Sequence, residues 1–304
     1  MTKNKGNHPL KGLFNGIGQV YFTPSVMTSF LLLFAISIES LALAFLTLFG
    51  AACSDWLAKY TNQPKQNIDN GLYALNGALI ALFIGNFFGV TPWMILVTAV
   101  GALLTVPLAH IVFRFKVYRG YTSAFVLVSW LIYVIYATFN FAIFDASTTP
   151  SSLVTVAITK SDLSDWFQPP STVIPLLKGI SQVSFINNEI SGLVMLFAVA
   201  FNSAKHAMWV VTAVVISTLF SNMIGVPNEY LEQGLYGYNA VLVTLALVLY
   251  QQITWPLIIV GILFTCLITL GFHTLSLLPL TAPFIISAWG IVYLSRWINR
   301  RFSS

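Results

Sequence analysis

The residues of this chain that could act on a small molecule are amides, hydroxyls and aromatic rings that occur in two related sets. The recurring segments are GIGQVYF at 16–22 with GISQVSF at 179–185, GLYALNGAL at 71–79 with GLYGYNAVL at 234–242, and TSAFVLVSW at 122–130 with TAPFIISAW at 281–289. The first two pairs are displaced along the chain by the same distance, and the third pair by a slightly shorter one. Because order and spacing are both preserved, the chain is predicted to contain two copies of one unit.

These repeated positions provide hydrogen-bond donors and acceptors without a titrating group. The pairs are Gln19 with Gln182, Phe22 with Phe185, Asn76 with Asn239, and Thr122 with Thr281. Taken singly, such amides can join helices by hydrogen bonds, and the rings can fill a core. Their recurrence favours a pathway at the interface of the two units, where each copy must supply equivalent lining residues. Gly71 and Gly234 flank these sites and allow the backbone to bend or to approach a neighbour closely.

Ionisable side chains give little support to catalysis or ion coupling. His8, His110, His206 and His273 are expected at helix ends or membrane surfaces, with His273 in an external turn, and Glu39 and Glu189 are expected near span ends. A charge at membrane depth usually has a function, and no such residue stands out. The sequence has neither an HExxH or paired-cysteine metal pattern nor a phosphate-binding loop. An enzyme, a metal site and a bound cofactor are therefore not expected.

The composition predicts that the protein lies in a lipid bilayer. The chain has 304 residues, of which 57% are hydrophobic and 8% are charged, a balance that a water-soluble domain could not cover with polar surface. The formal net charge of +5 comes from basic residues in short loops and at the ends, which indicates membrane topology and not nucleic-acid binding. Cys53 and Cys266 fall in apolar stretches, so a disulfide framework is not expected.

Ten apolar stretches approach the length that crosses a bilayer. The first set lies near 26–38, 41–57, 72–89, 92–113 and 120–144, and the second near 190–203, 207–224, 234–250, 254–271 and 280–296. The segment before residue 22 lacks a continuous apolar core and a cleavage site, so it is expected to be a cytoplasmic lead-in. These features predict an all-α integral membrane protein with one repeat over 1–144, an external linker over 145–175, and the other repeat over 176–304.

Five spans per unit is an odd number, so the second unit must enter the membrane from the opposite side. This predicts an inverted repeat with ten spans in total and both termini in the cytoplasm. The predicted cytoplasmic loops carry the basic residues Lys59, Lys65, Arg114, Lys116, Arg119, Lys205, Arg296, Arg300 and Arg301. The predicted external turns carry Glu39, Glu229 and Glu232 instead, as the bias of positive charge toward the cytoplasm requires.

The repeated motifs resemble those of the urea transporter family, which has bacterial and animal members. The matching features are GQV at 18–20, SQV at 181–183, the two GLY-containing segments, and Thr281 to Phe284, and they cover nearly the whole chain in family order. The resemblance implies a homotrimer in which each protomer has its own pore, with five spans and one half-crossing helix in each repeat. It also implies a multi-pass protein of the plasma membrane, which in a bacterium is the inner membrane.

The resemblance further implies roles for twelve residues in a narrow filter. One aromatic-flanked subsite would be formed by Gln19, Phe22 and Leu75, and the other by Gln182, Phe185 and Tyr238. The constriction between them would be narrowed by Val20, Leu79, Val183 and Leu242, with hydroxyls from Thr122 and Thr281. Leu75 stands where the family usually has an aromatic residue, Ala124 replaces a proline, and Glu189 also stands where proline is common.

Urea suits such a filter because it is flat and neutral, with four NH donors and one carbonyl acceptor. Leaving these groups unpaired in a dry pore would cost about 1–3 kcal/mol each, and a row of oxygens can replace the lost water. The expected function is therefore downhill passage of urea through a membrane channel. A channel for ammonium or another small amide, and an ion-coupled secondary transporter, are the alternatives.

Overall fold

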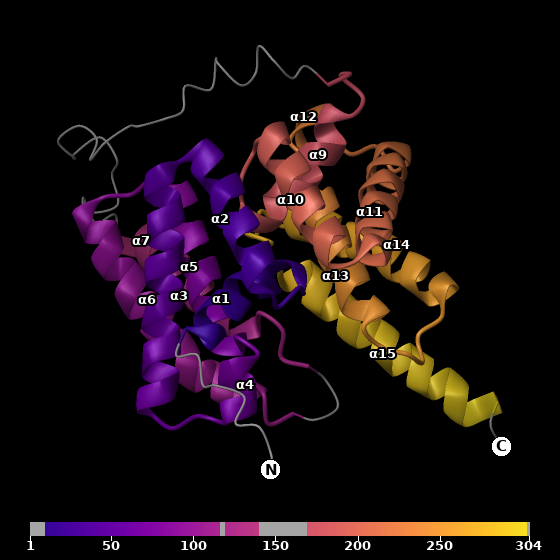
Figure 1. Ribbon diagram of the computed structural model, residues 1–304. Helices are drawn as coiled ribbons and strands as arrows, with labels where there is room; N and C mark the ends of the chain where they lie inside the picture. Colours follow the sequence, from indigo (N-terminus) through magenta and orange to yellow (C-terminus); the bar gives the residue numbers. More distant parts are fainter. Residues whose placement is uncertain (1–9, 116–118, 140–168, 303–304) are drawn as a thin grey trace.

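The computed structural model describes residues 10–115, 119–139 and 169–302, and within these ranges it contains helices and no strand (Figure 1). The first unit consists of α1 (Lys11–Gly18), the 3-10 helix η1 (Gln19–Tyr21), α2 (Val26–Glu39), α3 (Leu41–Tyr60), α4 (Lys65–Asp69), α5 (Leu72–Phe88), α6 (Pro92–Val112) and α7 (Ser123–Phe139). The second unit repeats this order as α9 (Ile174–Ser181), the 3-10 helix η4 (Gln182–Ser184), α10 (Glu189–Asn202), α11 (Ala204–Met223), α12 (Asn228–Glu232), α13 (Gly237–Val248), α14 (Trp255–Thr274) and α15 (Ala282–Phe302). The predicted all-α fold is confirmed.

Helices α3, α6, α10 and α11 begin after a side chain that accepts a hydrogen bond from the first turn. Ser40 caps α3 by accepting from the Leu43 N–H at 3.2 Å, and Ser203 caps α11 at the equivalent position. Thr91 caps α6 and is followed by a proline, which fits the first turn of a helix because its missing N–H would be unpaired there. The apolar runs and these caps together explain why the helix bounds agree with the predicted spans to within a few residues.

Four helices, α3, α6, α11 and α14, are long and apolar enough to cross a bilayer by themselves. Two bent pairs would each make a further span: α1 with η1 bends by 65° to α2, and α9 with η4 bends by 71° to α10. These features, found in the described part of the chain, make the protein a multi-pass membrane protein. Three shorter apolar helices, α5, α7 and α13, complete the set.

Helices α5 and α13 form the centre of their units. Every residue of α13 from 237 to 247 is buried, as are the residues of α5 from 73 to 84. A helix that is apolar on all sides belongs in such an enclosed position. The large exposed apolar side chains lie instead on the outer helices, for example Phe45 of α3 and Met208 of α11, where lipid would cover them.

Residues 11–22 correct the prediction of a cytoplasmic lead-in. They form α1 and η1, whose residues Gly12, Gly16 and Ile17 are buried against the rest of the first unit. The absence of a long apolar core excludes a full span, but a short helix that reaches partway into the fold does not need one. The second unit has an equivalent short helix, α9, which begins at Ile174, inside the segment assigned to the linker. Residues 145–168 of that segment lie outside the described part.

His273 also lies elsewhere than predicted. It belongs to the last turn of α14 and not to an external turn, because the apolar run of that helix continues to Thr274. Its ring stacks on Tyr230 with centroids 4.9 Å apart.

The two units pack through equivalent helices. Figure 1 shows the first unit in indigo to magenta beside the second in salmon to yellow, and α2 contacts α10 while α7 contacts α15. Between α2 and α10, the Ser191 hydroxyl donates to the Ala35 carbonyl at 2.8 Å, and the Thr28 hydroxyl donates to the Ala198 carbonyl at 3.5 Å. Because the repeat relates Thr28 to Ser191 and Ala35 to Ala198, each unit supplies the donor once and the acceptor once.

Two tryptophans show the same exchange of partners. The Trp130 indole of α7 donates to the Leu278 carbonyl at 2.9 Å, and the Trp289 indole of α15 donates to the Arg119 carbonyl at 3.0 Å. The repeat relates Trp130 to Trp289 and Arg119 to Leu278, so donor and acceptor exchange units between the two bonds. These four bonds recur with their partners exchanged, which is the pattern expected of two units that are related by an approximate two-fold axis.

Candidate solute pathway

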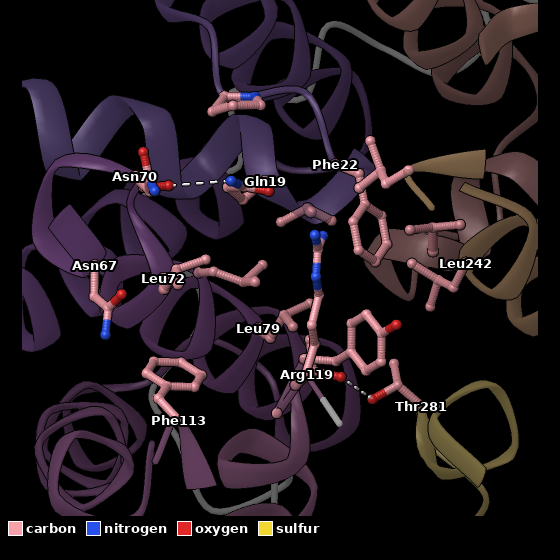
Figure 2. A pocket seen from close by; sticks show the side chains of 18 of the residues that line it. Gln19, Phe22, Asn67, Asn70, Leu72, Leu79, Phe113, Arg119, Leu242 and Thr281 are labelled. Carbon is pink, nitrogen blue, oxygen red and sulfur yellow. Dashed lines mark hydrogen bonds between the residues drawn. The ribbon is translucent and has the colours of Figure 1, made fainter. Parts of the chain in front are cut away.

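A cavity of about 470 Å³ lies where the two units meet (Figure 2). Nine of the twelve predicted site residues line it: Gln19, Val20, Phe22, Leu75, Leu79, Thr122, Val183, Leu242 and Thr281. Figure 2 shows Phe22, Leu79 and Leu242 around the same space. The cavity thus brings together the first-unit subsite and the whole predicted constriction.

The two threonines of the constriction meet at the interface of the units. Their hydroxyl oxygens are 2.8 Å apart and hydrogen-bonded to each other. The Thr122 carbonyl accepts from the Val126 N–H at 3.0 Å, and the Thr281 carbonyl accepts from the Ile285 N–H at 3.4 Å. Each threonine therefore stands at the beginning of a helix, α7 or α15, and the positive ends of both helix dipoles approach the constriction.

The repeated asparagines hold these two helices in place. The Asn76 side-chain oxygen accepts from the Phe125 N–H at 3.0 Å, and the Asn239 oxygen accepts from the Phe284 N–H at 3.4 Å. Phe125 and Phe284 lie in the first turns of α7 and α15, whose N–H groups have no partner within the helix. Each asparagine is thus a cap supplied by a neighbouring helix, and it positions the threonine that precedes the capped turn.

This arrangement predicts a stability cost for Asn76→Leu. Leucine keeps the branched shape of the asparagine side chain but leaves the buried Phe125 N–H without an acceptor, so we expect a loss of about 1–3 kcal/mol. Thermal unfolding in detergent measures it. Asn86→Leu is the matched control on the same helix, because the exposed Asn86 has, among the described residues, one side-chain partner, the Leu82 carbonyl of its own helix. Equal losses in the two variants would contradict the capping role.

The amides of the two glutamines are oriented by backbone carbonyls. Gln19 Nε2 donates to the Asn70 carbonyl at 3.2 Å, and Gln182 Nε2 donates to the Gln233 carbonyl at the same distance. Figure 2 shows the Gln19 bond, with the rest of the amide turned toward Phe22. Because the nitrogen is engaged, the Gln19 oxygen remains as an acceptor for a donor in the cavity.

The repeated phenylalanines end the two short 3-10 helices in a left-handed backbone conformation. Phe22 has φ 56° and Phe185 has φ 58°. Both rings reach across the interface: Phe22 lies 6.3 Å from Phe284 of α15, and Phe185 lies 5.8 Å from Phe125 of α7, between ring centroids. The pairs again exchange partners, so one turn geometry presents both rings to the opposite unit.

The remaining predicted residues, Gln182, Phe185 and Tyr238, do not line the cavity. Phe185 and Tyr238 lie together, with ring centroids 6.4 Å apart, and the Tyr238 hydroxyl donates to the Leu280 carbonyl at 2.7 Å. Gln182 is buried as well. The structure therefore keeps the two rings together, and all three residues lie outside the cavity, whose second-unit lining consists of Val183, Leu242, Leu249 and Thr281.

Several cavity residues were not predicted. Asn67, Asn70, Phe113, Phe115, Arg119 and Tyr121 are among them. The sequence pattern indicates that Arg119 is a loop charge that reports topology, but Figure 2 shows its side chain in the cavity, and its guanidinium lies 4.8 Å from the centre of the Tyr250 ring. Among the described residues that line the cavity, Arg119 is the one charged side chain.

Comparisons with known proteins assign the chain to a family. The model of the urea transporter family matches twice, over residues 10–172 and 173–304. Urea transporter 1 of Ovis aries and that of Capra hircus are each 24% identical over 264 residues, which cover 80% of this chain and 64% of the relative. Urea transporter 1 of Mus musculus is 29% identical over 95 residues, 30% of this chain and 25% of the relative. The chain thus spans less than two thirds of the length of these relatives.

The double match agrees with the two units of the fold, and together the two matched ranges leave unmatched only the first nine residues. The boundary between the matches at 172/173 lies just before α9, which is the counterpart of α1. This chain is a member of the urea transporter family.

Proposed function

We propose that this protein is a channel through which urea crosses the membrane down its concentration gradient. The observation that supports it best is the composition of the cavity: residues from both units surround one space with hydroxyls, amides, rings and aliphatic walls, and with one guanidinium group. Within the described lining, no carboxylate is present. The names of the family and of the sheep and goat relatives support urea as the solute.

The polar groups of the lining match those of urea. The Gln19 oxygen and the hydroxyl oxygens of Thr122 and Thr281 can accept from solute NH groups, while one threonine hydroxyl can turn its hydrogen to a solute carbonyl. Val20, Leu79 and Leu242 supply walls that offer a hydrated ion no substitute for its water. The same acceptors could serve another small amide, so selectivity among flat amides would depend on the width of the slot.

Cation passage is disfavoured by the charges around the cavity. Arg119 extends a guanidinium into it, and the amino-terminal ends of α7 and α15, each equivalent to about half a positive charge, meet at the threonine pair. A cation would need to be desolvated next to these positive charges. This argues against ammonium as the permeating species, since a neutral solute carries no such penalty.

Ion coupling would require a charged site that changes occupancy during transport. The buried acidic residue Asp55 pairs with Lys59 one turn further along α3, and neither lines the cavity. The Asp55–Lys59 pair is therefore better explained as a structural ion pair near the end of α3. The pathway needs no energy input under this interpretation.

The membrane arrangement proposed here is an inverted pair of five-span units with ten spans in total. In Figure 1, α4 and its counterpart α12 lie at opposite ends of the molecule, which supports the inversion. Both termini would then be cytoplasmic, and an external linker that ends before α9 would join the units. The family resemblance supports a homotrimer with one pore per protomer, in the plasma membrane or bacterial inner membrane.

The test is urea uptake into proteoliposomes, measured with and without an imposed proton gradient or membrane potential. We expect uptake that is faster than in protein-free vesicles, stops at equal concentrations inside and outside, and does not depend on either gradient. Accumulation of urea against its gradient would replace the channel with a coupled transporter. A current carried by ammonium in the same vesicles would support the alternative solute.

A further inference from the structure

The two units place a tyrosine beside their repeated phenylalanine from different positions of the chain. In the second unit, Phe185 lies edge-on to Tyr238, with centroids 6.4 Å apart and ring planes at 63°. The position equivalent to Tyr238 in the first unit is Leu75, which has no ring. Phe22 nevertheless has an edge-on tyrosine, because Tyr121 lies 6.1 Å away at 71°. The two ring pairs have nearly the same geometry.

Tyr121, like Leu75, has a different residue type at the equivalent position of the other unit. Its equivalent is Leu280, which directly precedes Thr281 as Tyr121 precedes Thr122. Each unit therefore has one tyrosine and one leucine at these two positions, in opposite order. The backbones of Tyr121 and Leu280 share a φ of 44°, so the same turn presents both side chains.

Tyr121 is held firmly against the cavity that it lines. Its ring packs edge-on against Phe284 at 5.4 Å, and its hydroxyl is hydrogen-bonded to the Tyr250 hydroxyl at 3.2 Å. The ring of Tyr250 in turn lies under the Arg119 guanidinium. Tyr121 is 9% exposed, so one part of the ring borders the cavity while contacts fix the rest.

We infer that Tyr121 is the second ring of the first-unit subsite and determines, with Phe22, how well that subsite selects a flat solute. This rests on the proposed function. Leu75 is the wall residue that fills the place left by the missing ring, and it does not itself make the aromatic contact. Aromatic rings provide a large rigid surface that aliphatic side chains do not, so the loss of one should affect flat solutes most.

The variant Tyr121→Leu tests the inference in proteoliposomes. We expect urea flux per protein molecule to fall about three- to tenfold, which is the size of one aromatic contact. The ratio of urea flux to glycerol flux should also fall, because glycerol is neutral and small but not flat. This ratio does not change if a substitution only reduces the amount of folded protein.

The double variant Leu75→Tyr, Tyr121→Leu is the second test, measured in the same assay. It gives the first unit the order found in the second, where the Tyr238 hydroxyl donates to the Leu280 carbonyl. The equivalent acceptor is the backbone carbonyl at position 121, which the side-chain change leaves in place. We expect the double variant to recover most of the urea flux and of the urea-to-glycerol ratio.

Two further variants separate the ring from other effects. Tyr121→Phe keeps the ring and loses the bond to Tyr250, so it should retain more than half of the flux; a loss as large as that of Tyr121→Leu would overturn the inference. Tyr293→Leu makes the same exchange on the outer face of α15, at a side chain that is 62% exposed, and is expected to leave flux unchanged. If Tyr121→Leu does not fold, the double variant and Tyr121→Phe decide the question.

Urea uptake by the wild-type protein separates a failure of the proposed function from a failure of the inference about Tyr121. Wild-type vesicles that take up urea no faster than protein-free vesicles would refute the proposed function. Wild-type uptake together with an unchanged urea-to-glycerol ratio in Tyr121→Leu would refute the role of Tyr121 alone.

Discussion

Vesicles that contain the double variant Thr122→Val, Thr281→Val are expected to take up urea about tenfold more slowly than vesicles with the wild-type protein. The two hydroxyls belong to residues that line the cavity, and they are hydrogen-bonded to each other at 2.8 Å. Valine keeps the shape of threonine but offers no oxygen to a passing NH group. An unpaired NH costs about 1–3 kcal/mol in a dry environment, and every 1.4 kcal/mol corresponds to a factor of ten.

The double variant should fold because it removes both partners of one hydrogen bond and leaves neither unpaired. Each single variant leaves the other hydroxyl without its partner, so the singles are expected to be less stable than the double. Thr98→Val is the matched control: its hydroxyl is buried in α6, has no partner within the described residues, and lies outside the cavity. Flux of the double variant equal to that of Thr98→Val, with both proteins folded, would rule out the threonines as filter oxygens.

A large loss of stability is expected for Gly71→Ala. Gly71 has φ 77°, and a Cβ added there would lie 2.5 Å from the Gly16 Cα and still closer to the Gly16 nitrogen. These are backbone atoms of α1 and cannot rotate away. Backbone strain of about 1–2 kcal/mol and overpacking of about 1–3 kcal/mol should combine to displace α1, and with it Gln19 and Phe22, from the cavity.

Gly225→Ala isolates the strain from the close approach. Gly225 has nearly the same φ, 79°, in the turn that ends α11, but no atom lies within 4 Å of an added Cβ. Thermal unfolding in detergent should therefore show a midpoint for Gly71→Ala that is at least about 5 °C below that of Gly225→Ala. Equal midpoints would mean that α1 does not need its contact with Gly71 to stay in place.

The sequence alone was sufficient for the long helices. Their apolar runs end at residues such as Ser40, Thr91 and Ser203 that cap the next helix, so composition and capping agree on the boundaries. Family membership, expected from the repeated motifs, is confirmed. The short helices α1 and α9 had no such signal, because a helix that enters the fold only partway is neither long nor strongly apolar. Its small residues, such as Gly12 and Gly16, allow close packing, and this role can be recognised only when the position of the partner helix is known.

Part of the lining of the cavity was predictable at positions where the two units keep the same residue type. Gln19, Phe22 and Thr122 stand at positions that repeat, and the structure places them around one cavity. Tyr121 could not be found in this way, because its counterpart is a leucine. A comparison of the two units finds positions with the same residue, and it misses a tyrosine that stands at a different position in each unit. Asn76 is recognisable as a repeated residue, but its capping role depends on the fold, which brings Phe125 to it from 49 residues away.

Arg119 shows a different limit of sequence analysis. A basic residue in a short loop between apolar stretches predicts membrane topology. The same residue can also project from its loop into a cavity, because the backbone at 119–122 turns back toward the interface, where its carbonyl accepts from Trp289. Loop charges at such a turn therefore need the fold before their role is known.

The exchange of partners across the unit interface has an evolutionary consequence. Two identical half-length subunits, related by the same axis, would already contain the bonds from Trp130 and Trp289 and the meeting of Thr122 with Thr281. A homodimeric ancestor is thus structurally sufficient, and gene duplication followed by fusion would preserve its interface. Fusion also releases a constraint, since identical subunits must carry the same residue twice, whereas the joined copies are free to diverge, as Leu75 and Tyr238 have done.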